Sequence, residues 1–445
     1  MEREASVVVV REYNAATDRA AAEEVERTCE LGSSGKMSLH TDLLGDPASR
    51  IRHSSTYLML VLFLLLRLVS PPGDEWSAQV AETCGGVKEI VGLVRGCVKV
   101  VTCGKKLPRQ GGSTKNICQV ATPTYTKVGY LLGLRVSPSH RYCSLSLSPP
   151  PCIDDNNDRR KGIGLRLVRQ MEGWFREKGA EYAYMATGKD NEASMRLFTE
   201  RCDYTKFRAP TILVHPVFAH HLPVPRSVTV LRLGHADAEA IYRRCFATTE
   251  FFPRDIDAVL RNPLTVATFL AVPAGCSAAR QWPGAEAFLA APPGSWAVAS
   301  AWDCGGVLRM EVRGASRLRR WAAAATRAAD RAMPWLRIPA VPDLFRPFVA
   351  WFLYGVGAEG PGAAEMAAAA WREAHNVARG SATVLAAEVA AGDSVLRGIP
   401  RWRWLSCAED VWCVKRLGEE YSDGGVGDWT KSGPGSSIFV DPREL

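Results

Sequence analysis

The segment between residues 130 and 175 constrains the fold most, because it joins a strand, a basic glycine turn and a helix start. The run Tyr130–Val136 is typical of a buried strand, and the amphipathic run Leu165–Phe175 is typical of a helix. The turn before this helix reads Arg159, Arg160, Lys161, Gly162, Ile163 and Gly164. Glycines let main-chain N–H groups approach a ligand, and a helix start adds unpaired donors and the positive dipole end. We therefore expect a pyrophosphate site at this turn.

The spacing of the turn narrows the kind of phosphate ligand. No P-loop run is present, and the third glycine of a dinucleotide fingerprint is missing. A second strand-like run, Tyr182–Thr187, follows the helix, and Asn191 then opens a segment that contains Leu197 and Phe198. The order of Arg-x-x-Gly-x-Gly, helix, strand and Asn-led helix resembles the coenzyme A site of the GCN5-related N-acetyltransferases. A plain strand–helix–strand unit with a glycine turn is the alternative.

The segments before the turn predict an α/β fold with a mixed sheet and helices on both faces. A β-rich opening at 6–13 precedes a helix that Asn14 or Thr17 caps and that ends near Cys29. A loop is expected from Gly32 to Ser54. Further strands are expected at 57–61, 89–94, 96–102 and 130–136.

Two segments, near 62–79 and 142–159, differ from their surroundings and are interpreted as foreign sequence, from a retained intron or a gene-model error. Without the second one, Arg141 joins Arg160 and the turn is uninterrupted, so that either Arg141 or Arg159 supplies its first basic position. Genuine surface loops are the alternative for both segments.

The second half of the chain echoes the first and predicts a second, degenerate fold of the same kind. The runs Thr229–Leu233 and His235–Tyr242 resemble the opening strand and helix, and Ala382–Val389 resembles the strand after the turn. At the place of the cofactor loop, Gly355–Gly362 precedes a helix, but Glu359 has the wrong charge for a pyrophosphate. An unrelated α/β domain is the alternative. The expected division is an acetyltransferase domain (1–215), a linker (216–228), the degenerate domain (229–415) and a tail (416–445).

Composition and net charge exclude few classes of protein. The net charge of +8 suits an anionic cofactor without requiring nucleic acid, and the basic run Arg317–Arg331 is expected to be a solvated helix face. Thirteen cysteines without a Cys-x-x-Cys pair, and no signal peptide, predict an intracellular protein with reduced thiols. The histidine pair of the linker, His220 and His221, is expected in a surface loop rather than a metal site. The apolar run Tyr57–Val69 is shorter than the ~20 residues of a membrane span and is expected to be a strand.

Acetyl transfer from a thioester to an amine requires a donor for the tetrahedral oxyanion and a base for the amine proton. The donor is expected on the strand before the turn, at the main-chain N–H of Leu134, with Arg135 and Val136 beside the cofactor. Because the strand Tyr130–Val136 carries no carboxylate, Glu89 is the candidate base.

The departing thiolate also requires a proton. Phe198 stands where the family resemblance implies a tyrosine, and phenylalanine has no proton to give. Tyr204 is therefore the candidate acid and Tyr184 is another. Their alternative role is as ordinary core residues beside strands.

Longer segments, from VVVREYN near the start to the end of the chain, resemble the plant HOOKLESS1-like N-acetyltransferases. The resemblance implies acetyl-CoA as co-substrate and no metal, with the turn, residues 134–136 and Asn191 binding the coenzyme. It also implies a protein amine, such as one of a histone, as acceptor, a nuclear location and a part in hormone-controlled growth. Neither a membrane nor nucleic acid is an expected partner. A regulator that binds acyl-CoA without turnover is the alternative function.

Overall fold

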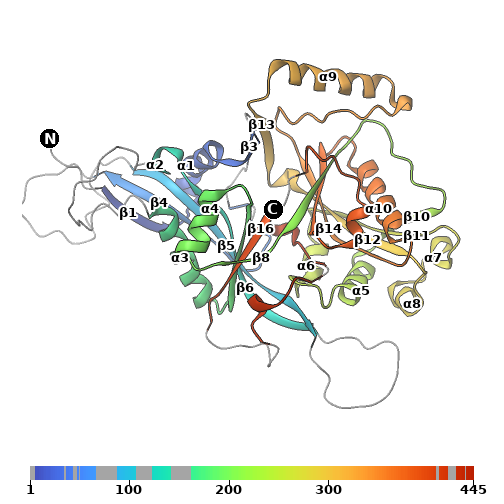
Figure 1. The fold of residues 1–445 in the computed structure, drawn as a ribbon, viewed down its shortest axis with the longest axis horizontal. Helices are drawn as coiled ribbons and strands as arrows, with labels where there is room; N and C mark the ends of the chain where they lie inside the picture. The colour runs from blue at the N-terminus through green and yellow to red at the C-terminus, as the bar shows by residue number, and fades with distance from the viewer. Residues whose placement is uncertain are drawn as a thin grey trace, which may run out of the picture.

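The computed structural model describes residues 6–34, 37–43, 48–49, 51–66, 88–106, 123–141, 162–406, 410–418, 427–435 and 437–444. Two mixed sheets carry the fold, one mainly from each half of the chain (Figure 1). The first sheet has the strand order β1-β4-β5-β6-β7-β16-β8, and only β6 and β7 are parallel. Its strands are β1 (Ser6–Glu12), β4 (Tyr57–Leu66), β5 (Lys88–Lys106), β6 (Pro123–Val136), β7 (Tyr182–Gly188), β16 (Asp410–Arg416) and β8 (Thr205–Arg208).

Helices cover both faces of the first sheet, as predicted. The helix α1 (Ala15–Thr28) begins at Asn14, whose side chain accepts a hydrogen bond from the Ala16 N–H at 2.9 Å. It packs on one face, and the longer α3 (Ile163–Glu177) packs on the other. Shorter helices follow the strands at α2 (Pro138–Arg141) and α4 (Glu192–Arg196), and α4 continues into a π-helical turn, Leu197–Arg201.

The strands expected at 89–94 and 96–102 are one continuous strand, β5, so the predicted break at residue 95 was wrong. Two glycines of this strand allow the close packing of α3. A Cβ on Gly92 would lie 2.9 Å from Ile163, and a Cβ on Gly96 would collide with Met171 and Phe175. Glycine in this strand therefore marks close approach of a helix.

The run Tyr57–Leu66 forms β4 and confirms the predicted strand. Residues Leu62–Leu66, the first of the segment interpreted as foreign, belong to β4 and pair with β1. The remainder of that segment, and all of 142–159, lie outside the described residues. Of the helices that the structure describes, none combines the length and apolarity needed to cross a bilayer.

The second sheet repeats the plan of the first, with the order β10-β11-β12-β14-β15-β9. Only β14 and β15 are parallel, and α10 (Ala363–Ala378) lies between them in the chain as α3 lies between β6 and β7. The strands are β10 (Val228–Leu233), β11 (Thr265–Pro273), β12 (Trp296–Asp303), β14 (Ala350–Glu359), β15 (Val384–Ala390) and β9 (Pro210–Pro216). The further helices are α5 (His235–Cys245), α6 (Ile256–Leu260), α7 (Ser277–Arg280) and α8 (Ala285–Ala290).

Each sheet contains a strand from the other half of the chain. The strand β9 crosses the boundary predicted at 215 and pairs with β15 in the second sheet. The strand β16 crosses the boundary predicted at 415 and lies between β7 and β8 in the first sheet. The sheets therefore do not follow the division drawn from the sequence, because pairing between distant strands leaves no local pattern.

Buried charges after β16 also join the halves. Arg443 donates to Asp441 and to Asp255 of the second half, and the Lys99 ammonium of β5 lies 3.6 Å from an Asp441 oxygen. All but Asp255 are buried. Since breaking a buried ion pair leaves an uncompensated charge, these contacts make the relative position of the halves specific.

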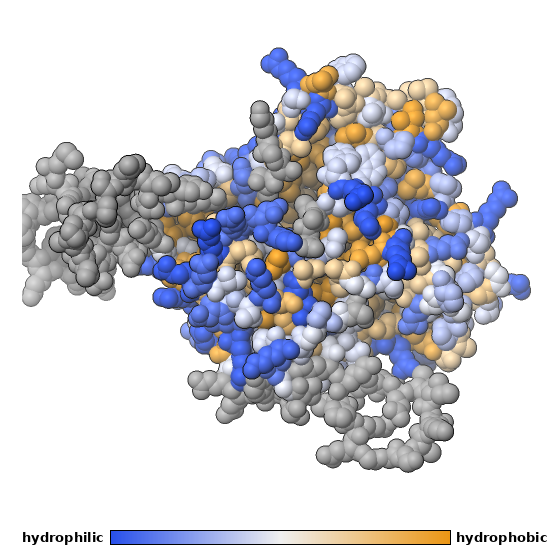
Figure 2. All heavy atoms as spheres, in the orientation of Figure 1, coloured by the Kyte–Doolittle hydropathy of each residue, from blue (hydrophilic) through white to orange (hydrophobic). Residues whose placement is uncertain are grey.

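The loop expected at 32–54 contains a hairpin, β2 (Glu30–Ser34) and β3 (Met37–Leu43), so this expectation was wrong. The hairpin pairs with β13 (Arg309–Arg313) of the second half in a third sheet. The basic run forms α9 (Arg317–Ala332), which lies at one end of the molecule (Figure 1). Its outer surface includes Leu318 and Trp321, 74% and 70% exposed, and apolar side chains show at that end in Figure 2.

The histidine pair of the linker was expected in a surface loop, but one of the two is buried. His215 and His220 are buried, and only His221 is exposed. His220 Nδ1 lies 2.6 Å from one carboxylate oxygen of Asp330 on α9. The other oxygen of Asp330 accepts the Ala219 N–H. The linker is therefore packed against the second half and holds α9 in place.

Candidate active site

The two parallel strands of the first sheet, β6 and β7, separate from each other before they end. They are paired over four rungs, from Val128↔Tyr182 to Leu131↔Met185. Beyond the last rung β6 continues to Val136 and β7 to Gly188, with no described pair between them. We call this gap, between residues 132–136 and 186–188, the wedge. It opens at the carboxyl ends of parallel strands, where open α/β sheets bind ligands.

A β-bulge lies on β6 inside the wedge. The register between β5 and β6 shifts here, so that Gly133 and Leu134 lie opposite the single residue Val94. Gly133 has a φ of 60°, and a Cβ there would collide with the guanidinium of Arg95. A bulge leaves one residue outside the ladder. This is the place where the sequence predicts the oxyanion donor, the main-chain N–H of Leu134.

The helix α3 begins beside the bulge. Its N-cap is Gly162, which has no side chain to satisfy the first N–H groups of the helix. A Cβ on Gly164 would lie 3.1 Å from Leu197 and 3.9 Å from both Leu134 and Val136, so glycine permits this close packing. Five predicted cofactor residues are thus together: Leu134, Val136, Gly162, Ile163 and Gly164. The predicted Arg159, Arg160 and Lys161 lie outside the described residues.

Asn191 follows β7 and is the N-cap of α4. Its side-chain oxygen accepts the Ser194 N–H at 3.1 Å, so its structural role is to start this helix. Leu197, just after α4, contacts the position of Gly164. The second motif is thereby placed against the first turn of α3.

Arg135 points inward rather than toward a phosphate. Its Nε lies 3.5 Å from an oxygen of Glu26 on α1, and Arg95 Nη1 donates to the other oxygen of Glu26 at 2.6 Å. Arg95 and Glu26 are almost completely buried. The three side chains hold α1 against the bulge, so any contact of residue 135 with a cofactor is through its main chain.

Comparison with known proteins agrees with this geometry. The sequence profile of the Acetyltransferase (GNAT) family matches residues 156–204, which include the turn, α3, β7 and Asn191. Two Arabidopsis thaliana proteins, "Probable N-acetyltransferase HLS1-like" and "Probable N-acetyltransferase HLS1", are each 52% identical to this chain. The first match covers 99% of both chains, and the second covers 99% of this chain and 100% of the relative. The rice protein "Acetyl transferase GW6a" is 36% identical over 99% of this chain and 98% of its own.

The chain belongs to the HLS1-like N-acetyltransferases. It is therefore a probable acetyltransferase of the GNAT family, and the wedge between β6 and β7 is its candidate active site. Because the relatives match over their whole length, both halves are part of the family's architecture.

The two residues proposed from the sequence as acid and base do not lie in the wedge of this HLS1-like protein. Tyr204 is buried, its ring packs edge-on to Phe198, and burial next to Glu172 raises the pKa of Tyr204 well above its usual value. Glu172 lies nine residues after Ile163, about 13 Å along α3. Glu89 is exposed near the start of β5, opposite Leu64 of β4. Residue type and strand propensity, on which the two assignments relied, do not show which strand ends lie together in the fold.

Tyr184, the other tyrosine candidate, is also engaged elsewhere. Its hydroxyl donates to Glu444, and burial raises its pKa well above the usual value. The ring stacks between Tyr130 and Trp412, with centroids 4.6 and 5.6 Å away. It therefore forms part of the core beneath the wedge.

The second half contains the corresponding bulge and loop, but protein atoms fill them. Gly355 has a φ of 58°, and a Cβ there would collide with the ring of Tyr242. At the start of α10, the Gly362 N–H donates to the Ser295 hydroxyl at 2.9 Å, and a Cβ on Gly360 would overlap the Gly294 carbonyl. The Gly362 N–H at the start of α10 thus already has a partner within the protein.

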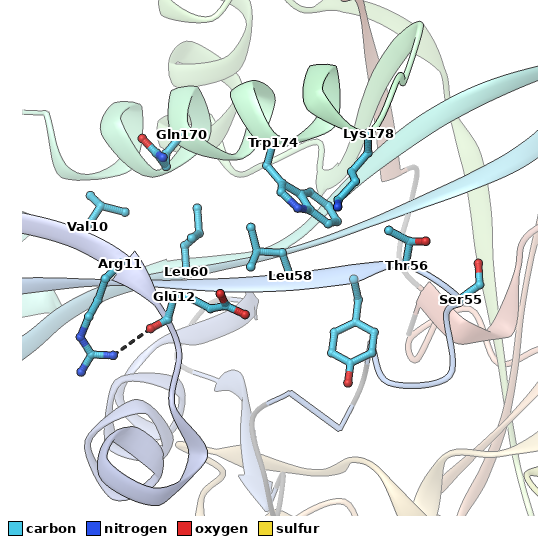
Figure 3. Close-up of a pocket in the computed structure, with 11 residues that line it drawn as sticks. Val10, Arg11, Glu12, Ser55, Thr56, Leu58, Leu60, Gln170, Trp174 and Lys178 are labelled. Atoms are coloured by element: carbon cyan, nitrogen blue, oxygen red, sulfur yellow. Dashed lines mark hydrogen bonds between the residues drawn. The ribbon is translucent and has the colours of Figure 1, made fainter.

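A separate groove of about 620 Å³ lies between α3 and the strands β1 and β4. Trp174 and Lys178 of α3 extend over Leu58 and Leu60 (Figure 3). Arg11 at its rim is held by Asp18 at 2.7 Å. The groove is not part of the wedge, because its α3 residues, such as Gln170, lie further along the helix than Gly164.

Sequence reasoning missed two carboxylates near the end of β7. Asp410 of β16 pairs with Gly188, and Glu388 of β15 accepts a hydrogen bond from the Trp412 indole at 2.9 Å. Burial and the neighbouring Asp410 raise the pKa of Glu388 to about 8, although the bond from Trp412 acts in the opposite direction. Burial also raises the pKa of Asp410. The sequence has no local pattern that shows this, because the two carboxyl groups reach β7 only through the pairing of the distant strand β16 with it.

Proposed function

We propose that this protein transfers the acetyl group of acetyl-CoA to an amine of a protein substrate. The observation that carries the proposal is the wedge, with the bulge at Gly133 and Leu134 beside the uncapped start of α3 at Gly162. A main-chain donor and a helix start at this spacing suit a thioester carbonyl and a diphosphate of one coenzyme.

The residues of the wedge have distinct parts in this proposal. The first N–H groups of α3 bind the diphosphate, and Gly164 allows the helix to begin close to β6. The Leu134 N–H stabilises the oxyanion that forms when the amine attacks the carbonyl. Glu26 and Arg95 position the bulge that presents this donor. The coenzyme supplies the activated acetyl group and leaves as a thiol.

The protein amine and the cellular setting rest on the family resemblance. Two carboxyl groups near the end of β7, Glu388 and Asp410, offer oxygens that can accept a hydrogen bond from an amine. We propose a nuclear location and a role in hormone-controlled growth on the resemblance alone. Imaging of the tagged full-length protein tests the location, and exclusion from nuclei contradicts it.

Calorimetric titration with acetyl-CoA, followed by measurement of CoA release with histone and other peptide amines, tests the activity. Binding with amine-dependent release supports the proposal. Binding without release for any amine supports the second candidate, a regulator that senses acyl-CoA. Phe198 in place of the expected tyrosine, and the remote position of Tyr204, favour that candidate. Absence of binding contradicts both functions.

A further inference from the structure

A carboxyl group of the second half reaches the first sheet next to the wedge. Glu388 belongs to β15, yet its carboxyl oxygen accepts the Trp412 indole N–H of β16 at 2.9 Å. Trp412 pairs with Ala186 of β7. Ala186 directly follows Met185, the last β7 residue paired with β6. Glu388 therefore contacts the strand adjacent to β7 at the level where the wedge opens.

This carboxyl group lies on the face of the sheet opposite α3. Trp412, Tyr184 and Tyr130 pack in the same core as α1 and the second half, whereas Leu131 and Met185 pack against α3. Side chains alternate between the faces of a strand. An amine that enters the wedge from the face opposite α3 therefore approaches on the face that carries Glu388.

A second carboxylate near the wedge, Glu26, is unsuited to take up a proton. Its two oxygens lie 2.6 Å from Arg95 and 3.5 Å from Arg135, and guanidinium groups favour the charged carboxylate. Glu388 has instead a neutral donor, Trp412, and a second carboxyl group, Asp410, as neighbours. Glu388 is only partly buried, so a substrate can reach it.

The charged groups around Glu388 differ from those around Glu26 and favour the uptake of a proton by Glu388. Burial raises the pKa of Glu388 to about 8, and Asp410 on β16 acts in the same direction. The nearest basic side chain in register is Arg208 of β8, opposite Trp412, and it is paired with Glu250. Lys206 of β8 is opposite Cys413, whose side chain belongs to the other face. A carboxylate with this affinity for protons is a stronger base than an ordinary glutamate.

We propose that Glu388, supplied by the second half, is the base that accepts the proton of the acceptor amine in the wedge of the first half. This inference rests on the proposed acetyl transfer. The amine nitrogen forms a bond to the thioester carbonyl carbon, and the carbon–sulfur bond breaks with its electron pair going to sulfur. The amine loses one proton to the Glu388 carboxylate. The degenerate half is thus part of the active site, although its own cofactor loop is filled.

The test compares Glu388→Gln with the wild-type full chain. Glutamine retains an acceptor for Trp412 but cannot take up a proton. We expect kcat to fall by about 10² to 10⁴, the usual contribution of a general base, with an unchanged Kd for acetyl-CoA. The limb of the pH–rate profile near pH 8 disappears, while the limb from the substrate amine, measured with one peptide throughout, stays. Glu177→Gln is the matched control and keeps wild-type rates, since Glu177 is exposed at the end of α3 that is remote from the wedge.

A second variant separates catalysis from structure. Asp410→Asn removes the neighbouring charge, so we expect the limb assigned to Glu388 to move to lower pH. A merely structural role of Glu388 predicts no such movement. The inference is overturned if Glu388→Gln turns over like the wild type, or if it loses acetyl-CoA binding along with activity. Failure of the wild type to acetylate any amine overturns the proposed function and this inference together.

Discussion

Gly133 on β6 and Gly355 on β14 have the same backbone conformation at corresponding places in the two halves, with φ of 60° and 58°. Each lies at a register shift against the preceding antiparallel strand. Their neighbours differ, since Gly133 faces the guanidinium of Arg95 and Gly355 faces the ring of Tyr242. The two halves therefore share a backbone plan, and aromatic packing fills the second bulge where polar groups surround the first.

Substitution at the two helix starts tests whether only the first half binds the coenzyme. Gly162 and Gly362 are the N-caps of α3 and α10, with similar φ and ψ of −113° and 8°, and −91° and 13°. In Gly162→Asp, the carboxylate caps the first N–H groups and repels a diphosphate. We expect an unfolding free energy within a few tenths of a kcal/mol of the wild type, but an acetyl-CoA Kd at least about 10-fold weaker, a change of ~1.4 kcal/mol.

Gly362→Asp is the matched control for this experiment. The Gly362 N–H already donates to Ser295, so no ligand is expected there. Calorimetry should therefore give a wild-type Kd for Gly362→Asp. Equal weakening by both substitutions, or by neither, contradicts the assignment of the diphosphate to the start of α3.

The buried pair of Glu26 and Arg95 is expected to be a large determinant of stability. In Glu26→Ala, the Arg95 guanidinium stays buried without its carboxylate, which costs about 3–5 kcal/mol. Glu23→Ala breaks only the more exposed pair with Arg19 on the same helix and should cost less than about 1 kcal/mol. Urea unfolding of the two variants measures the difference. Similar midpoints would show that the buried pair contributes no more to stability than the exposed pair does.

Two buried histidines predict loss of stability in acid. Burial lowers the pKa values of His215 and His375 to about 4 from the ordinary 6.5. The unfolded chain therefore binds more protons than the folded protein between pH 6.5 and pH 4, and stability falls as the pH decreases through this range. The loss is about 2 kcal/mol for each histidine at pH 5.

Unfolding in urea at pH 7 and pH 5 measures this effect. His215→Phe removes one titrating group from the apolar contact with Phe218 and should make the dependence on pH shallower. His221→Ala changes an exposed histidine of the same linker and should keep the wild-type slope. A steep dependence that survives His215→Phe unchanged would assign the effect to other groups.

Local sequence signals predicted the parts of the fold that local chemistry determines. The cap at Asn14, the start of α3 at Gly162 and the strand–turn–helix order of both halves follow from capping, glycine and hydrophobic periodicity. The bulge also lies where the oxyanion donor was expected, at Leu134.

Long-range pairing decides the rest, and no periodicity within one segment encodes it. The strands β9 and β16 have ordinary apolar patterns, so nothing local shows that they exchange sheets. Glu388 and Glu26 are ordinary glutamates in the sequence and acquire their chemistry only through Asp410, Trp412 and Arg95. The contacts between the glycines of β5 and α3 are likewise not visible in the sequence of one strand.

Removal of the segment 142–159 is expected to strengthen coenzyme binding. The segment enters the turn between Arg141 and Arg160, and its deletion gives a continuous basic run before Gly162. Titration of the deletion variant with acetyl-CoA should give a lower Kd than the full chain gives. An unchanged Kd would mean that the turn already has its binding geometry with the segment present.

The exchange of strands predicts that the two halves unfold together. Loss of the first sheet releases β16, which leads into the buried Asp441 and Arg443, and so removes contacts to Asp255 in the second half. Loss of the second sheet releases β9, which continues from β8. Neither half can therefore open without exposing core of the other, and a single cooperative transition is expected.

Urea unfolding followed by tryptophan fluorescence and by far-ultraviolet circular dichroism should give coincident curves. Trp412 is a suitable reporter because it is buried where the two halves meet. Trp412→Phe keeps a ring on Tyr184 but removes the hydrogen bond to Glu388, so a lower midpoint with one remaining transition is expected. Two separate transitions in the wild type would mean that each half is stable alone, and that the exchanged strands do not couple them.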